Sequence, residues 1–492
     1  MTPIRSSAPV RGPHRLALGL FVLVWLSISW FGSSPYNANN STRMFAAISL
    51  VEQHDATIDE FSDLTIDKAK FGKHTYLDKA PGMTIMAMPA VWLGDMLTGT
   101  TATPMAKEIG NKDFWDFMRL RLRIAVAMTV ALLTAFAAVL LLDLATGITG
   151  SARAGFVTAL AYALATPVWG WSTTLFGHAP VGALLLIATW AVWRGTSGER
   201  EMARWRYPVM AGLALGWALV VEFPAAIPAF PIGLWVLWRT RAVAWPVRAR
   251  LYGIAVAAGL VALVPLLAYN AIAFGTPFKV GYQGVVGFNG MQQGLFGLTY
   301  PKAEVLWQIV FGTERGMLWL APVLLLAPLG LVRLIRAPET RDLGWLCVTV
   351  TVAVLLYNAA YVYWDGGHST GPRHSVPMIG FLCLGIAPLW QSWSATGKGW
   401  IAGLIASGIF INFAVAACEI AAPHGFRFPL VAPVMTDLFE GRVNNIAGEY
   451  WGWQPMLGLI PWLVIAVSLL AWLIREASLS AAEDRDIRAV LA

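Results

Sequence analysis

Residues 251–273 read LYGIAVAAGLVALVPLLAYNAIA and carry no charged side chain. A helix that crosses the hydrocarbon core of a bilayer needs about 20 predominantly apolar residues. Further segments share this character, and we predict membrane-crossing helices also at 15–31, 121–143, 154–170, 178–194, 208–222, 223–238, 316–334, 343–363, 374–391, 400–418 and 455–474. The composition agrees, with 57% hydrophobic and 13% charged residues and a mean hydropathy of +0.61. The sequence therefore predicts an all-α integral membrane protein with about twelve transmembrane helices.

The charged residues divide between alternate connections of these helices. Arginines fall before the first segment and in every second connection after it, namely Arg5, Arg11, Arg15, Arg153, Arg194, Arg200, Arg204, Arg206, Arg239, Arg241, Arg248, Arg250, Arg333, Arg336 and Arg341. The positive-inside rule then places both termini in the cytoplasm of a multi-pass protein of the inner or plasma membrane. The net charge of +7 follows from this distribution and gives no indication of nucleic-acid binding.

The acidic residues lie mostly in three connections on the opposite side, 32–118, 274–315 and 419–453. No internal repeat or separate soluble domain is evident, so we expect residues 1–492 to form one membrane domain with these three external loops. Because the polar residues gather on the external side, that side is where we expect the function.

The first external loop, 32–118, is predicted to contain two juxtamembrane helices joined by an acidic segment at 52–79. Met44, Phe45 and Ile48 recur at helical spacing after residues typical of an N-cap, which predicts a short helix with its apolar stripe in the lipid headgroups. A second such helix is predicted from about 81 to 98, where a proline and the short length disfavour a full span.

Asp78 and Lys79 lie at the start of the second of these helices and form the first candidate site. A carboxylate can act as a general base, and a neighbouring cation at a helix start can hold a phosphate. The simpler alternative is an ordinary surface ion pair. Asp67 and Asp59, on the same loop, are further candidates for the base.

Two other segments offer cations to an external ligand. Arg43 is suited to bidentate contact with a lipid phosphate. The alternative is that its side chain only extends to the lipid headgroups and binds no substrate. His368 and Arg373 flank a glycine-rich turn in the segment YWDGGHSTGPRH at 363–374, the alternative there being a tight turn between helices. Glu222, before a proline at a span end, is more simply read as an interface residue. No metal-ligand spacing and no nucleotide motif is present, so we predict no metal and no cofactor.

At these residues the chain resembles the GT-C superfamily of membrane glycosyltransferases, which includes protein O-mannosyltransferases and the aminoarabinose transferase that modifies lipid A. The segment Asn40-Ser41-Thr42-Arg43 resembles an Asp-Glu-x-Arg motif in the first external loop of that family. The segment from Tyr76 to Gly82 resembles a Lys-Pro-Pro turn further along the same loop. The resemblance covers about the first hundred residues best and the later spans in layout.

One departure from the family pattern affects the choice of base. This chain has Asn40 where relatives place a catalytic aspartate, and an amide cannot accept the proton. Either the acid has moved to Asp78, Asp67 or Asp59, or the chemistry differs. The resemblance implies phosphate binding at Arg43 and Lys79, and the other residues expected to contact the substrate are Tyr76, Asn40, His368 and Arg373.

The resemblance also implies an activity. The protein is expected to be a hexosyl- or pentosyltransferase that moves a sugar from a polyprenyl-phosphate donor in the membrane lipid to a glycan, lipid or protein acceptor, with inversion, at the extracytoplasmic face. One alternative is a glycan ligase or polymerase using a diphosphate carrier, for which 419–453 offers His424, Arg427 and Arg442. Another is a transporter of a lipid-linked substrate, which predicts internal repeats and charges at mid-membrane depth.

Overall fold

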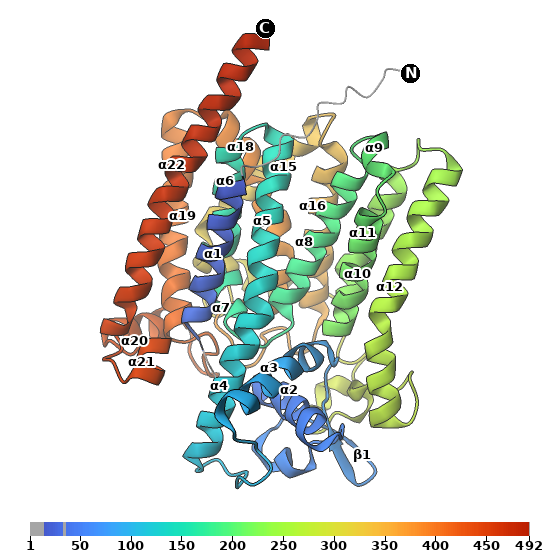
Figure 1. Ribbon diagram of the computed structural model, residues 1–492, viewed down its shortest axis with the longest axis vertical. Helices are drawn as coiled ribbons and strands as arrows, with labels where there is room; N and C mark the ends of the chain where they lie inside the picture. Colours follow the sequence, from blue (N-terminus) through green and yellow to red (C-terminus); the bar gives the residue numbers. More distant parts are fainter. Residues whose placement is uncertain (1–13, 33–35, 492) are drawn as a thin grey trace.

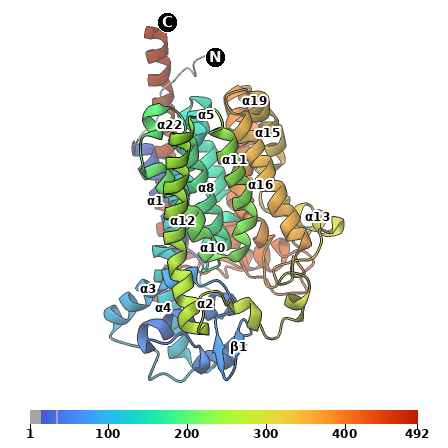
Figure 2. The ribbon, with the colours of Figure 1, turned by 90° about the vertical axis from the view of Figure 1, so that its right-hand side faces the viewer.

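The computed structural model describes residues 14–32 and 36–491, with side chains described as far as 479. Most of these residues are helical. The longer helices form a bundle, and a smaller polar layer made from the first loop covers one end of it (Figures 1 and 2).

The bundle consists of α1 (His14–Trp30), α4 (Lys112–Met128), α5 (Val130–Thr149), α6 (Ala152–Leu164), α8 (His178–Gly195), α10 (Arg206–Val221), α11 (Ala226–Arg239), α12 (Trp245–Phe274), α15 (Ala327–Arg336), α16 (Arg341–Ala360), α17 (Ile379–Cys383), α18 (Ile386–Ser392), α19 (Ala395–Ala417) and α22 (Ile460–Leu491). Shorter helices lie in the connections, namely α2 (Ala38–Ile48), α3 (Gly82–Thr98), α7 (Val168–Ser172), α9 (Glu199–Met202), α13 (Ala303–Val310), α14 (Met317–Leu320), α20 (Thr436–Phe439) and α21 (Ile446–Trp451).

Six helical stretches in the described part of the chain are long and apolar enough to cross a membrane: Lys112–Thr149, Trp245–Phe274, Arg341–Ala360, Arg373–Ser392, Ala395–Ala417 and Leu457–Leu479. Four shorter helices are also apolar: His14–Trp30, Ala152–Leu164, Arg206–Val221 and Leu430–Phe439. The prediction of a helical membrane protein is confirmed, whereas the figure of about twelve crossings stays a prediction.

Two of the predicted spans are interrupted. The span at 316–334 is divided into α14, a 3-10 turn at Pro322–Leu326 and α15. The span at 374–391 is divided into a 3-10 turn at Arg373–Met378, α17 and α18. Pro322 and Pro377 lie in these turns, and the ring nitrogen of a proline has no hydrogen to donate to a continuous helix.

The first loop differs from its predicted form in two ways. Every residue of α2 from Asn39 to Ile48 is buried in the protein, so the prediction that its apolar stripe lies in the headgroups is wrong. The ring of Phe45 stacks on that of Phe61, with centroids 4.6 Å apart, and protein packing thus replaces lipid. The loop also contains an unpredicted antiparallel hairpin, with β1 (Ala69–Phe71) paired to β2 (His74–Tyr76).

The second predicted surface helix agrees better with the structure. Helix α3 runs through Pro89 and leaves Trp92, Met96 and Leu97 more than half exposed. The predicted loop ended at 118, but α4 already begins at Lys112. Together α2, α3 and the hairpin form a lid over the bundle end (Figure 1).

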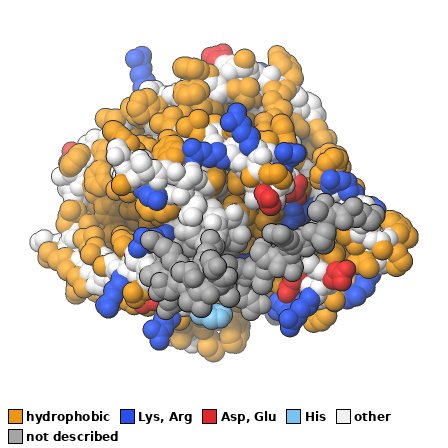
Figure 3. Space-filling model, turned by 90° about the horizontal axis from the view of Figure 1, so that it is seen from above, with side chains coloured by type: hydrophobic (Ala, Val, Ile, Leu, Met, Phe, Trp, Pro, Cys, Tyr) orange, Lys and Arg blue, Asp and Glu red, His pale blue; other side chains and the backbone are white. Residues whose placement is uncertain are grey.

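The arginine-bearing connections gather at the other end of the bundle, where α9 and the C-terminal end of α22 lie (Figure 1). Figure 3 shows this end, with Lys and Arg side chains outnumbering acidic ones among the hydrophobic residues. Arg5 and Arg11, which entered the prediction of orientation, lie outside the described residues. The bundle therefore has one basic end and one end covered by the first loop.

Candidate active site

A cavity of about 760 Å³ lies between the first-loop layer and the covered end of the bundle. Its floor comes from the start of α2, the segment 63–68 and Asp78–Lys79. Its wall comes from α8, the α10–α11 junction, the loop 282–291, the end of α16 and the turn 363–374. Segments distant in the sequence thus meet around one space.

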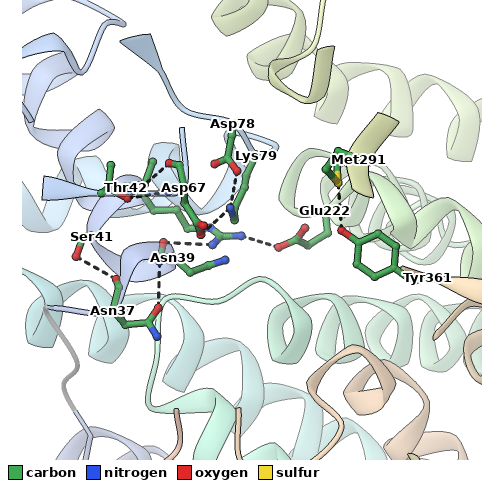
Figure 4. Close-up of polar contacts among 12 residues, drawn as sticks. Asn37, Asn39, Ser41, Thr42, Asp67, Asp78, Lys79, Glu222, Met291 and Tyr361 are labelled. Carbon is green, nitrogen blue, oxygen red and sulfur yellow. Dashed lines mark hydrogen bonds and ion pairs between the residues drawn. The ribbon is translucent and has the colours of Figure 1, made fainter. Parts of the chain in front are cut away.

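Lys79 occupies the floor between two carboxylates. Its Nζ lies 2.9 Å from an oxygen of Asp67 and 2.7 Å from Asp78 Oδ2 (Figure 4). The backbone of Asp67 is fixed because Thr42 Oγ1 donates to its carbonyl at 2.8 Å. Asp78 Oδ1 is buried and has no hydrogen-bond partner among the described residues.

The electrostatics of this triad separate its two acids. Burial raises the pKa of Asp78, and the neighbouring charge of Asp67 adds to that rise. Burial also acts to raise the pKa of Asp67, but the attraction of Lys79 outweighs it and the pKa lies below its usual value. Burial acts to lower the pKa of Lys79, and the two carboxylates reverse that effect, so that its pKa is raised. Lys79 is therefore a firmly charged cation.

Arg43 pairs with Glu222 directly behind the cavity wall. Arg43 Nη2 lies 2.6 Å from Glu222 Oε1, and the arginine side chain is 1% exposed. Glu222 lines the cavity and Arg43 does not. The structure therefore places the predicted phosphate ligand Arg43 behind the wall, where it contacts a carboxylate.

Arg373 faces the cavity without an acidic partner in the described part of the chain. Its guanidinium lies 4.8 Å from the ring centroid of Phe176, and its Nε is buried without a hydrogen-bond partner. The backbone passes close to this side chain at Gly366, where an added Cβ would lie 2.9 Å from Arg373 Nε and φ is +76°. Only glycine suits that position, which explains part of the glycine-rich turn.

Aromatic side chains form the opposite wall, namely Tyr282, Phe288, Tyr357, Tyr361 and Tyr363. The rings of Tyr357 and Tyr361 are stacked with centroids 6.0 Å apart. The 275–302 loop is held over the cavity because Val286 N donates to Lys68 O at 3.2 Å and Gly290 N donates to the Tyr363 hydroxyl at 2.9 Å. Such rings offer flat apolar faces together with hydroxyl groups.

His368 lies at the exposed margin of the cavity beside His424, with ring centroids 5.6 Å apart. Burial lowers the pKa of His368, and the nearby His424 and Arg373 lower it further. His368 is therefore neutral near pH 7, when it can exchange hydrogen bonds but adds no charge.

Five of the nine predicted site residues line the cavity: Asp67, Asp78, Lys79, His368 and Arg373. Arg43 lies behind its wall, and the other three are engaged elsewhere.

Asp59 accepts hydrogen bonds at 2.6 Å from the ring of His74 and from Thr75 N. Tyr76 packs its ring against Phe274, with centroids 5.4 Å apart. Asn40 is buried and its Oδ1 accepts a hydrogen bond at 2.9 Å from Leu175 N, which ties α2 to the segment before α8. None of these three residues lines the cavity.

Sequence reasoning underestimated Glu222 and missed the aromatic wall. The signal for Glu222 was an acid at the end of an apolar span, directly before Phe223-Pro224. Tyr357, Tyr361 and Tyr363 lie close together in the sequence, whereas Tyr282 comes from a separate loop, so the sequence does not show that they share one wall.

Solved structures with a similar fold agree with the fold that the resemblance to the GT-C superfamily predicted. Two of the similar solved structures are those of ArnT from Cupriavidus metallidurans, one in the apo state and one bound to undecaprenyl phosphate. The apo structure aligns with a TM-score of 0.52 at 16% identity, and the bound one with 0.51 at 15%. Both alignments cover 94% of this chain and 75% of the other. No family model matches the sequence, and no curated protein matches it.

Proposed function

We propose that the protein transfers a sugar from a polyprenyl-phosphate donor to a hydroxyl group of a glycan, lipid or protein at the extracytoplasmic face. The observation that carries this proposal is the cavity, where Lys79 and the unpaired Arg373 lie in one space with an aromatic wall. The GT-C fold supports it, since a structure with the same fold binds undecaprenyl phosphate.

Lys79 and Arg373 are proposed to hold the phosphate. Charge-assisted hydrogen bonds to phosphate are about twice as strong as neutral ones. Arg373 makes no ion pair with a described carboxylate that the phosphate would have to displace. Lys79 is already held by two acids, which orient it and keep it charged. Val181, Pro228 and Val354 line the same cavity and offer apolar contact to the first units of the lipid.

The sugar is proposed to lie against the aromatic wall. The C–H groups of a sugar ring pack on aromatic faces, and the tyrosine hydroxyls can bond its hydroxyl groups. In the proposed step the acceptor oxygen bonds to the anomeric carbon, whose bond to the phosphate oxygen breaks. The phosphate leaves with the electron pair, and a carboxylate takes the proton of the acceptor. This single displacement inverts the anomeric centre.

The test is transfer in membranes prepared from cells that lack the gene and then express it. Radiolabelled glucose, mannose and arabinose are each supplied on undecaprenyl phosphate, and label in the glycan, lipid and protein fractions is counted. We expect the wild type to transfer at least one sugar and the double variant Lys79→Gln/Arg373→Gln to transfer none. If vesicles took up a lipid-linked substrate and no sugar were transferred, the protein would be a transporter and this proposal would be wrong.

A further inference from the structure

We propose that Glu222 is the base that takes the proton from the acceptor hydroxyl. This inference rests on the proposed transfer function and assigns the carboxylate in it. Asp67 and Asp78, the acids that the sequence favoured within the cavity, both bind the Nζ of Lys79, whereas Glu222 does not.

Glu222 is placed by a break in the backbone. Helix α10 ends at Val221, and Glu222 takes an extended conformation, with φ −150° and ψ 124°, before a 3-10 turn at Phe223–Ala225. Its backbone N still bonds to Ala218 O at 3.0 Å. The side chain passes close to Gly177, where an added Cβ would lie 2.4 Å from Glu222 Cγ. Backbone and packing therefore both restrict the carboxylate.

Arg43 then orients that carboxylate. It donates to Oε1 at 2.6 Å from a fully buried position. The other oxygen, Oε2, has no hydrogen bond to any described residue, and Glu222 lines the cavity. One oxygen is thus fixed in the wall, and the other is available to a molecule in the cavity. Arg43 is a positioning residue in this arrangement.

The two aspartates are committed to Lys79. Asp67 and Asp78 each lie within 2.9 Å of its Nζ, and the remaining oxygen of Asp78 is buried in protein. Proton uptake by either acid would weaken its hold on the cation that is proposed to bind the phosphate. Glu222 has no contact with Lys79, and Figure 4 shows it on the side toward Tyr361. It therefore reaches the part of the cavity proposed for the sugar.

The step is balanced without a further reactant. The O–H bond of the acceptor breaks as its oxygen bonds to the anomeric carbon, and the proton passes to Glu222 Oε2. The bond between the anomeric carbon and the phosphate oxygen breaks, and the lipid phosphate leaves with its electrons. The proton then passes to water before the next turnover.

The first experiment is Glu222→Gln in the transfer assay above, with the sugar that the wild type accepts. The amide carbonyl can still accept from Arg43, but the side chain cannot take a proton. We expect kcat to fall about 10²–10⁴-fold, the usual contribution of a positioned base. The acidic limb of the kcat–pH profile should disappear, while the affinity for undecaprenyl phosphate alone stays within twofold.

Other ionisable groups surround Glu222 and can shape that profile. They are Arg43 on α2, His178 on α8, Tyr282 in the external loop, Tyr357 on α16, Tyr361 after it, and Arg373 and His374 in the turn. For this reason the Glu222→Asp variant is measured as well. It should restore part of kcat together with the acidic limb, which a merely structural role would not do.

Loss of the partner of a buried arginine can prevent folding, so a second variant removes both charges. Arg43→Met/Glu222→Gln replaces the ion pair with two neutral side chains, an exchange that is often tolerated. The matched control is Glu449→Gln, since Glu449 also pairs with an arginine, Arg123, at 2.7 Å but lies outside the cavity. We expect the double variant to bind undecaprenyl phosphate without transferring sugar, and the control to transfer normally.

Three results overturn the assignment. The first is a folded Glu222→Gln enzyme, or a folded double variant, whose kcat lies within a few-fold of the wild type. The second is loss of undecaprenyl phosphate binding in parallel with transfer, which would make Glu222 a binding residue. The third is a kcat–pH profile whose acidic limb survives in Glu222→Gln. If the wild type itself transfers no sugar, the proposed transferase function is wrong. The wild-type transfer rate therefore distinguishes failure of the proposed function from failure of the Glu222 assignment.

Discussion

The two ends of the helix bundle both contain buried pairs of arginine and carboxylate, but the pairs are completed differently. At the basic end, Arg194 donates from Nε and Nη2 to the two oxygens of Asp143, at 2.7 and 2.5 Å. Trp190 donates to the same carboxylate at 2.6 Å, and of these groups only Arg194 Nη1 is left without a partner. The pair joins α5 to α8.

A second pair at that end also joins two helices. Arg239 on α11 donates to Asp342 on α16 at 2.6 Å, and Trp235 donates to the same oxygen at 2.9 Å. The Nε of Arg239 is occupied by Thr196 at 2.6 Å. Neither of these two carboxylates lines the cavity, and each pair holds two helices together.

The covered end leaves several groups open. Arg373 has no acid among the described residues, and one oxygen each of Asp78 and Glu222 has no protein partner. Unpaired polar groups in a protein interior cost free energy. Arg373 and Glu222 lie around a cavity of about 760 Å³, in which a phosphate and a sugar would pair with them. Unpaired groups around a cavity indicate a binding site, whereas the pairs at the basic end lie outside the cavity and join helices.

The variant with the largest expected effect is Lys79→Gln, which tests whether the charged groups around the cavity carry the transfer activity. It removes the cation proposed to face the phosphate and leaves Asp67 and Asp78 without their shared partner. We expect transfer to fall by at least about 10²–10³-fold, as for the loss of one electrostatic donor at a transition state.

Lys107→Gln provides the matched control for Lys79→Gln. Lys107 lies in the same loop and pairs with Glu60 at 3.1 Å, but it does not line the cavity. We expect its transfer rate to stay within about twofold, since a partly exposed pair contributes little. Equal losses in the two variants would show that the loop fold, and not the cavity, explains the effect.

The sequence was sufficient for the class of fold because apolar length is a local property that a bilayer enforces. It was also sufficient for Lys79 with Asp78, which are neighbours in the chain. It did not indicate that Arg43 pairs with Glu222, which lies 179 residues further on. It also did not indicate that Tyr76 packs against Phe274, or that Asp59 bonds to His74 within the first loop. The two long-range pairings depend on how the helices pack, and one sequence does not contain that information locally.

The second test is Arg194→Gln at the basic end. Removal of one partner from a buried ion pair leaves Asp143 uncompensated, and we expect a loss of about 3–5 kcal/mol in the free energy of unfolding. Transfer per folded molecule should be unchanged, because Arg194 lies at the end of α8 opposite to the cavity. Thermal denaturation in detergent, combined with the transfer assay, measures both quantities. A normal stability with lost transfer would reverse the roles that we give the two ends.

The third test is Arg373→Lys, which keeps the charge and removes the planar fork. A lysine cannot bond a phosphate in bidentate fashion, and it loses the stacking of the guanidinium on Phe176 at 4.8 Å. We expect KM for the lipid donor to rise about tenfold, equivalent to about 1.4 kcal/mol, with a smaller change in kcat. The control is Arg442→Lys, since Arg442 pairs with Asp437 outside the cavity. An unchanged KM in Arg373→Lys would remove Arg373 from the phosphate site.

The smallest expected effect concerns His368 at the cavity margin. Its pKa is lowered in the folded protein, by burial first and then by His424 and Arg373, from the ordinary value of 6.5. The unfolded chain therefore binds the proton more readily than the folded one at pH values just below 6.5, and the free energy of unfolding falls as the pH is lowered through that window. Because the ring is exposed, solvent reduces the effect, and we expect His368→Gln to narrow the difference in Tm between pH 7 and pH 5 by about 1 °C or less. A wider difference in Tm in the variant would mean that protonated His368 gains a stabilising partner. The cavity margin would then stabilise a positive charge, as the cavity floor does for Lys79.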